Sequence, residues 1–151
     1  DLKPGINYNY YETRWFRLLD SISLDPTKQG VTDKFNISLR TRDQGFLIQF
    51  EGFINIKEEG LYRFYLLSTT GCKLFLGNSM IINNPCTKAK NDPLYVKEEY
   101  SYEAYLDPGY YPIKVLYTNP WFYGDDFVVS YMGPGFEKKE IPAEVLFYKN
   151  N

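Results

Sequence analysis

The loop that spans Asn119 to Asp126 holds the residues of this chain that are best suited to ligand chemistry. It sets three aromatic rings beside two adjacent carboxylates. Flat aromatic faces stack on the C–H face of sugar rings, while carboxylates accept hydrogen bonds from sugar hydroxyls. The composition therefore suits a glycan-binding loop, with Trp121, Tyr123, Asp125 and Asp126 as candidate ligand residues.

The same loop could instead be an ordinary structured connection. In that interpretation Trp121 or Phe122 folds under the loop and fills part of the core. Asp126 would then accept a hydrogen bond from a nearby backbone N–H, as Asp side chains often do in turns.

Weak calcium binding is a further alternative at this loop. Calcium takes oxygen ligands, above all carboxylates. Asp125 and Asp126 could supply the charge, with help from the side chains of Asn83 or Asn84, which are also candidate ligand residues. Apart from this weak calcium option, we expect no cofactor and no dedicated metal site.

Catalytic chemistry has little support in the sequence. The chain contains no His, which removes the commonest general base and the usual partner of a Ser or Cys nucleophile. The paired acids Glu58-Glu59 and Glu98-Glu99 resemble a glycosidase pair only superficially, because adjacent residues on a strand point to opposite faces. We therefore expect a domain without catalytic residues. Only carboxylates that converge in space would revive an enzyme interpretation.

The only two cysteines lie on either side of a predicted hairpin that turns at Gly77-Asn78. Regular pairing around that turn would place Cys72 opposite Asn83, with Cys86 just beyond the paired region. A Cys72–Cys86 disulfide is then possible if the chain curls back, and the spacing leaves the question open. Two cysteines without His are too few for a zinc site.

The composition indicates one all-β domain over residues 1–151. The chain has 151 residues, 15 Tyr and 11 Phe, and hydrophobic residues make up 44% of it. Aromatic and β-branched residues suit pleated, half-buried surfaces, and this length suits one domain with a real core. Short predicted strands separated by turn signals indicate an antiparallel β-sandwich.

Alternating side chains locate most of the strands. In the segment 46–57, Phe46, Ile48 and Phe50 should face one way and Gln49 and Glu51 the other. We expect the segment 61–67 to be packed on both faces, and residues 25–30 to form a turn. The predicted strands are 5–12, 34–40, 46–57, 61–67, 74–76, 80–82, 94–105, 110–117 and 127–132.

Several motifs together resemble the protective-antigen (PA-14) domain family. They are Gly5–Glu12 at the opening, Phe50–Ile54, Gly60–Phe64, Leu74–Gly77, Ile81–Asn84, Leu106–Ile113 and Ile141–Ala143 at the close. Their order and spacing make the resemblance fairly specific over nearly the whole chain. It implies a β-sandwich of the PA-14 type.

The resemblance also implies where a calcium ion would bind if this chain had the family's calcium site. In the sugar-binding members of that family, an Asp-Asp pair joined by a cis peptide holds a calcium ion at a corner loop. Thr69 and Thr70 stand at the matching positions, and their hydroxyls carry no charge. We expect a plain turn capped by threonine hydroxyls there, without that calcium site. The loop at Trp121 matches the second ligand-facing loop of the family.

The resemblance implies a non-catalytic carbohydrate-binding or accessory module of a glycoside hydrolase such as a β-glucosidase or β-hexosaminidase. The alternative is a structural or protein-interaction domain of an adhesin or toxin-like surface protein. Expected partners are a glycan or the catalytic domain of the parent protein. Either role implies an extracellular, periplasmic or cell-surface location.

Charge and hydropathy exclude other partners. Lys plus Arg number 17 against 19 Asp plus Glu, so the basic surface expected of a nucleic-acid binder is missing. No apolar run approaches the length of about 20 residues that a membrane span requires. Because no signal peptide is visible and the chain starts at Asp1 without Met, we expect a mature or excised form.

Overall fold

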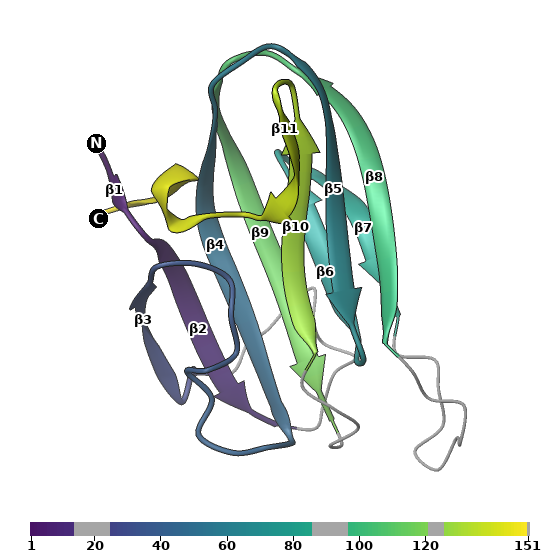
Figure 1. The fold of residues 1–151 in the computed structure, drawn as a ribbon. Helices are drawn as coiled ribbons and strands as arrows, with labels where there is room; N and C mark the ends of the chain where they lie inside the picture. The colour runs from purple at the N-terminus through teal and green to yellow at the C-terminus, as the bar shows by residue number, and fades with distance from the viewer. Residues whose placement is uncertain (14–24, 86–96, 121–125, 151) are drawn as a thin grey trace.

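Twelve strands and one turn of 3-10 helix account for the regular structure in the described part of the chain (Figure 1). A computed structural model describes residues 1–13, 25–85, 97–120 and 126–150. The strands are β1 (Leu2–Pro4), β2 (Ile6–Glu12), β3 (Lys28–Thr32), β4 (Phe46–Ile56), β5 (Gly60–Ser68), β6 (Cys72–Leu76), β7 (Ser79–Asn84), β8 (Glu98–Leu106), β9 (Gly109–Asn119), β10 (Phe127–Gly133), β11 (Phe136–Glu140) and β12 (Leu146–Lys149), with the helical turn η1 at Ala143–Val145. No helix within these ranges is long and apolar enough to span a membrane.

The strands form two antiparallel sheets that face each other. The larger sheet runs β1-β12-β4-β9-β6-β7, and β2 also pairs with β4 and carries β3 on its other side. The smaller sheet runs β11-β10-β5-β8. The prediction of an all-β antiparallel sandwich is confirmed.

The core lies between the sheets and follows the predicted alternation along β4. Phe46, Ile48 and Phe50 are fully buried, whereas Glu51 is exposed on the outer face. Phe50 stacks on Phe127 of the smaller sheet with ring centroids 6.1 Å apart. Such offset aromatic pairs add to the free energy of apolar burial, so β4 and β10 are fixed against each other across the core.

The two faces of β5 differ, and the prediction that both are packed is wrong. Its inner residues Tyr62, Phe64 and Leu66 are buried. On the outer face Leu61 is 57% exposed, and Arg63 forms an ion pair with Glu103 on β8 at 3.3 Å. Within the described ranges no further sheet lies over this face of the smaller sheet.

The predicted strand at residues 34–40 is also wrong. The Asn36 side chain accepts a hydrogen bond from the Ser38 backbone N–H at 3.0 Å, and the Arg40 N–H donates to the Ile37 carbonyl at 3.1 Å. These local bonds compete with a strand ladder. Phe35 is nevertheless buried and meets Phe50 edge to face, so the segment closes the core as a turn.

The neighbouring strand β3 falls partly where the sequence predicts a turn. Its residues pair with β2 from Lys28 opposite Tyr10 to Thr32 opposite Ile6. The short strands β1, β11 and β12 also have no counterpart among the predicted strands. β1 and β11 consist mostly of exposed residues, and β12 is only four residues long, so none of them shows an alternating apolar pattern.

Two substitutions on β5 test the assignment of its faces. Leu66→Ala should lower the free energy of unfolding by about 2 to 5 kcal/mol, because Leu66 is fully buried and the change leaves a cavity. The same change at exposed Leu61 should stay within about 0.5 kcal/mol of wild type. Urea denaturation measures both values. Equal losses at the two positions would contradict the assigned faces.

Candidate functional site

Several strand ends meet at one end of the sandwich, which we call the corner end. It comprises the turn Ser68–Gly71, the last residues of β7 and β9, and the first residues of β8 and β10, all in the lower part of Figure 1. Phe127 and Glu98 both pair with Ser68, from opposite sides of β5. The corner end is therefore shared by both sheets.

The turn Ser68–Gly71 is held by short polar contacts. The Ser68 hydroxyl accepts a hydrogen bond from the Thr70 N–H at 3.0 Å, so Ser68, and not a threonine, caps the turn. The Thr69 N–H donates to the Asp126 carbonyl at 3.3 Å. The Thr69 hydroxyl is buried and has no hydrogen-bond partner in the described part of the chain. All peptide bonds of the turn are trans.

Beneath the turn lies a buried polar network on β9. The Thr118 N–H and hydroxyl both donate to the Gly71 carbonyl, at 3.0 and 3.1 Å. The Asn119 amide donates to the Tyr117 hydroxyl at 3.3 Å. Burial raises the pKa of Tyr117, although hydrogen bonds with Thr70 and Asn119 act in the opposite direction. The Tyr117 hydroxyl therefore stays protonated at neutral pH and serves as a fixed structural group.

Polar burial is concentrated at this end of the core. In the described ranges, only one of the buried polar residues, Ser130, lies away from the corner end. Each buried polar group needs a partner to offset its lost hydration, and the bonds above supply several of them. The turn is consequently anchored to the larger sheet by the hydrogen bonds of Thr118.

The Asp126 carboxylate reaches solvent at the corner end. It forms an ion pair with Lys97 at 3.8 Å, and both side chains are about half exposed. Lys97 precedes Glu98, and Asp126 precedes Phe127, so the pair spans the end of β5 beside Thr69. An ion pair this exposed contributes little to stability, so the carboxylate remains available to a ligand.

A β-bulge in β7 decides which of the two candidate asparagines faces the core. Leu74 pairs with Ile82 but Phe75 pairs with Met80, which leaves Ile81 as an extra residue on β7. A one-residue shift moves every later side chain to the other face. The prediction that Cys72 lies opposite Asn83 is therefore wrong, because Cys72 pairs with Asn84.

Adjacent strand residues point to opposite faces, and the bulge turns Asn84 inward and Asn83 outward. Asn84 is buried at the corner end, and its amide donates to the Glu98 carbonyl at 3.3 Å, which links the two sheets. Asn83 is exposed on the outer face of the larger sheet, opposite Lys73. The structure thus does not bring these two side chains together.

Cys72 is a free, buried thiol in the described part of the chain. Burial raises the pKa of this thiol well above its usual range. Cys86 lies outside the described residues, so the Cys72–Cys86 bridge stays a prediction.

Three candidate ligand residues also lie outside the described residues: Trp121, Tyr123 and Asp125. The described residue that flanks them, Asp126, lies at the corner end. Within the described ranges, no three His, Cys, Asp or Glu side chains are grouped so that they could hold a metal ion.

Sequence reasoning missed Lys97 and the buried hydroxyls of Ser68, Tyr117 and Thr118. The polar pair Thr118-Asn119 at the end of an apolar strand was a usable signal, because polar residues at buried strand ends require partners. Lys97 gave no signal, since its partner Asp126 is distant in the sequence.

Comparisons with known proteins give a family and a set of related folds. The model of the PA14 domain family matches residues 2–144. An anti-sigma factor domain-containing protein from Clostridium clariflavum matches with a TM-score of 0.76 and 19% identity, over 96% of this chain and 48% of that chain. The chain thus spans about half the length of that protein. No curated protein matches the sequence.

Two further solved structures share the fold. The epithelial adhesin 9 A domain from Candida glabrata, solved in complex with Galβ1-3GlcNAc, matches with a TM-score of 0.70 and 13% identity over 97% of this chain and 90% of that chain. The β-glucosidase from Kluyveromyces marxianus, solved with glucose, matches with a TM-score of 0.57 and 18% identity over 75% of this chain and 14% of that chain.

The asparagine pair gives a matched test of the corner end. Asn84→Ala should lower the free energy of unfolding by about 1 to 3 kcal/mol, because the Glu98 carbonyl loses its buried donor. Asn83→Ala removes the same side chain from an exposed position and should change it by less than about 0.5 kcal/mol. Chemical denaturation measures both. A larger loss at Asn83 would contradict the bulge.

The buried thiol predicts a pH dependence under reducing conditions. The unfolded chain loses the Cys72 proton above a pH of about 8.5, whereas the folded chain keeps it. Rising pH therefore favours unfolding, and at pH 9.5 the thiol should cost about 1.4 kcal/mol relative to neutral pH. The Cys72→Ala variant should lack this loss of stability between neutral pH and pH 9.5. Denaturation curves at both pH values measure it, and an equal pH dependence in the two proteins would contradict it.

Proposed function

Because this chain belongs to the PA14 domain family, we propose that it is a non-catalytic carbohydrate-binding module that contacts sugar at its corner end. The supporting observation is the half-exposed Asp126 carboxylate, which lies beside Lys97 and next to the hydrogen-bonded turn Ser68–Gly71. Carboxylate and ammonium groups together accept from and donate to sugar hydroxyls. Trp121 and Tyr123 would add stacking faces, and Asp125 a second carboxylate.

We propose that this binding needs no calcium at the corner. The Thr70 hydroxyl is buried and lies 3.4 Å from the Ser68 hydroxyl, and the Thr69 hydroxyl is buried as well. Calcium needs several oxygen ligands, with charge supplied by carboxylates. Two buried neutral hydroxyls do not fit that requirement. Weak calcium binding through Asp125 and Asp126 remains the alternative.

The parent protein we propose is a secreted, periplasmic or cell-surface glycoside hydrolase, such as a β-glucosidase or β-hexosaminidase. A related fold occurs within a much longer β-glucosidase, of which the match covers 14%. In such a protein the module would hold the enzyme near its polymeric substrate or shape the rim of the neighbouring active site.

The second candidate is a protein-interaction domain of an adhesin or toxin-like protein, and one observation favours it. β8 is an edge strand of the smaller sheet and exposes Tyr100, Tyr102 and Tyr105. Edge strands with exposed rings can pair with a strand of another protein. A protein ligand would then contact β8 and leave the corner end free.

Glycan binding is the direct test. The isolated domain should bind at least one oligosaccharide on a glycan array and in calorimetric titration, equally in calcium and in EDTA. Trp121→Ala and Asp126→Ala should each weaken binding about tenfold or more, because each removes a contact worth about 1.4 kcal/mol. Unchanged thermal unfolding of both variants would show that the fold is intact.

A matched control is Glu103→Ala, which removes an exposed, ion-paired carboxylate from the outer face of the smaller sheet. Its sugar affinity should equal that of wild type. Binding to no glycan would leave the protein-interaction candidate ahead, and binding that disappears in EDTA would contradict the calcium-independent mechanism.

A further inference from the structure

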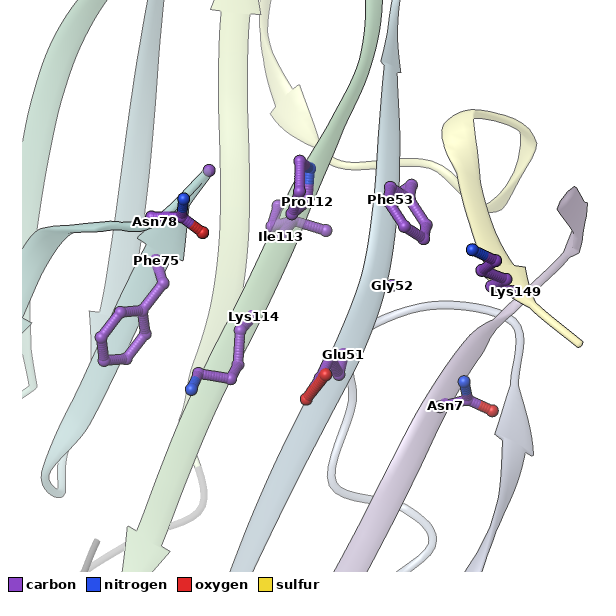
Figure 2. Close-up of a pocket in the computed structure, with 11 residues that line it drawn as sticks. Asn7, Glu51, Gly52, Phe53, Phe75, Asn78, Pro112, Ile113, Lys114 and Lys149 are labelled. Carbon is purple, nitrogen blue, oxygen red and sulfur yellow. The ribbon is translucent and has the colours of Figure 1, made fainter. Parts of the chain in front are cut away.

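The outer face of the larger sheet is hollowed into a trough, away from the turn at the corner end. A cavity of about 550 Å³ crosses β2, β4, β9 and β6 (Figure 2). A second cavity of about 380 Å³ shares Asn7 and Glu51 with the first and continues over β3. We use "trough" for the two together; the residues that matter for its chemistry are Asn7, Asn9, Gln29, Gln49, Glu51, Phe53, Phe75 and Lys114.

Strand register aligns carboxamides across the trough. Gln29 pairs with Asn9, and Asn9 pairs with Gln49, so three amides lie side by side on adjacent strands. Directly opposed residues share a face, with Cβ atoms about 5 Å apart. In the next row Asn7 pairs with Glu51. Hydrogen-bonding groups therefore recur at each strand spacing, which is about the width of one sugar ring.

These polar groups are only partly occupied by the protein. The Gln49 amide donates to Glu51 at 3.2 Å. The side chains of Asn7 and Gln29 are exposed and make no hydrogen bond to any residue of the described ranges. Each carboxamide offers a donor and an acceptor, which matches a sugar hydroxyl that both donates and accepts.

Aromatic rings complete one half of the trough. Phe53 is half-buried on β4, and Phe75 stands on β6 with the Lys114 ammonium 4.6 Å from its ring centre. In Figure 2, Lys114 extends along the surface towards Phe75, while Glu51 and Asn7 project from the neighbouring strands. An aromatic ring can stack on the C–H face of a pyranose while neighbouring amides form hydrogen bonds with its hydroxyls.

The outer face of the smaller sheet provides an internal comparison. There Arg63 pairs with Glu103, and Lys138 contacts Glu99 at 2.7 Å. That face is an ion-paired surface of the usual solvated kind. The trough has three charged side chains, those of Glu51, Lys114 and Lys149. Its uncharged carboxamides are more numerous, which favours an uncharged ligand over a nucleic acid or an acidic polymer.

We propose that the trough binds an extended, uncharged oligosaccharide that lies across the strands of the larger sheet. This inference rests on the proposed carbohydrate function but assigns a second surface, distinct from the turn and from the Trp121 loop. Amides of β2, β3 and β4 hydrogen-bond the hydroxyls, and Phe53 packs against a ring face. The Lys114 ammonium stays on Phe75 and donates to a hydroxyl at that end.

Nuclear magnetic resonance on the isotope-labelled domain tests this assignment. The probes are cellohexaose, mannohexaose and chitohexaose, with a hyaluronan hexasaccharide as the charged comparison. At least one neutral probe should shift the side-chain amide signals of Asn7, Asn9, Gln29 and Gln49. The double variant Asn7→Ala/Gln49→Ala should weaken that binding about tenfold or more. Gln44→Ala, an exposed amide outside the trough, should leave it unchanged.

The outcomes separate the two proposals. Shifts confined to the corner end, lost in Asp126→Ala and kept in the double variant, would overturn the trough and leave the proposed function standing. Failure of every hexasaccharide to bind would overturn the trough, whereas the proposed function fails only if the glycan array shows no binding as well. Binding of hyaluronan alone would overturn the uncharged ligand. Preserved signal dispersion in the double variant would show that its fold is intact.

Discussion

The pairing between β4 and β9 is the constraint on which the rest of the molecule depends. The two strands stay in register from Phe46 opposite Asn119 to Ile56 opposite Gly109 without a shift. Because side chains alternate between faces, this one ladder sends Phe50 and Val115 into the core and Glu51 and Lys114 to the outer surface. It also places Asn119 at the corner end, where the turn that connects β5 and β6 is anchored.

The elements with a strong apolar alternation could be predicted from the sequence. β4 is the clearest case, because burial of Phe46, Ile48 and Phe50 is the same physical effect that makes the pattern visible. The turn at Asn36 could not be predicted in this way, since its buried Phe35 and Ile37 also alternate. At Asn36 a hydrogen bond from the Ser38 backbone to the Asn36 side chain outweighs strand propensity. A propensity pattern contains no information about such a bond.

The candidate site was harder to predict for two physical reasons. A bulge adds one residue without changing the apolar composition, so nothing in the segment Met80–Asn84 shows which of Asn83 and Asn84 faces the core. Contacts such as Lys97–Asp126 form only because β8 and β10, which are distant in sequence, lie on either side of β5, and the sequence pattern does not show this. By contrast, the residue types at Thr69 and Thr70 are readable directly, and they carry the argument against a calcium corner.

The two ends of the described chain run side by side at one edge of the larger sheet (Figure 1). Leu2 pairs with Lys149 and Pro4 with Phe147, so the polypeptide enters and leaves the sandwich at a single point. A unit with this geometry can be spliced into a surface loop of a host domain without separating the two sides of that loop. In such an arrangement the corner end would face away from the paired ends of the chain, as the tip of a projection.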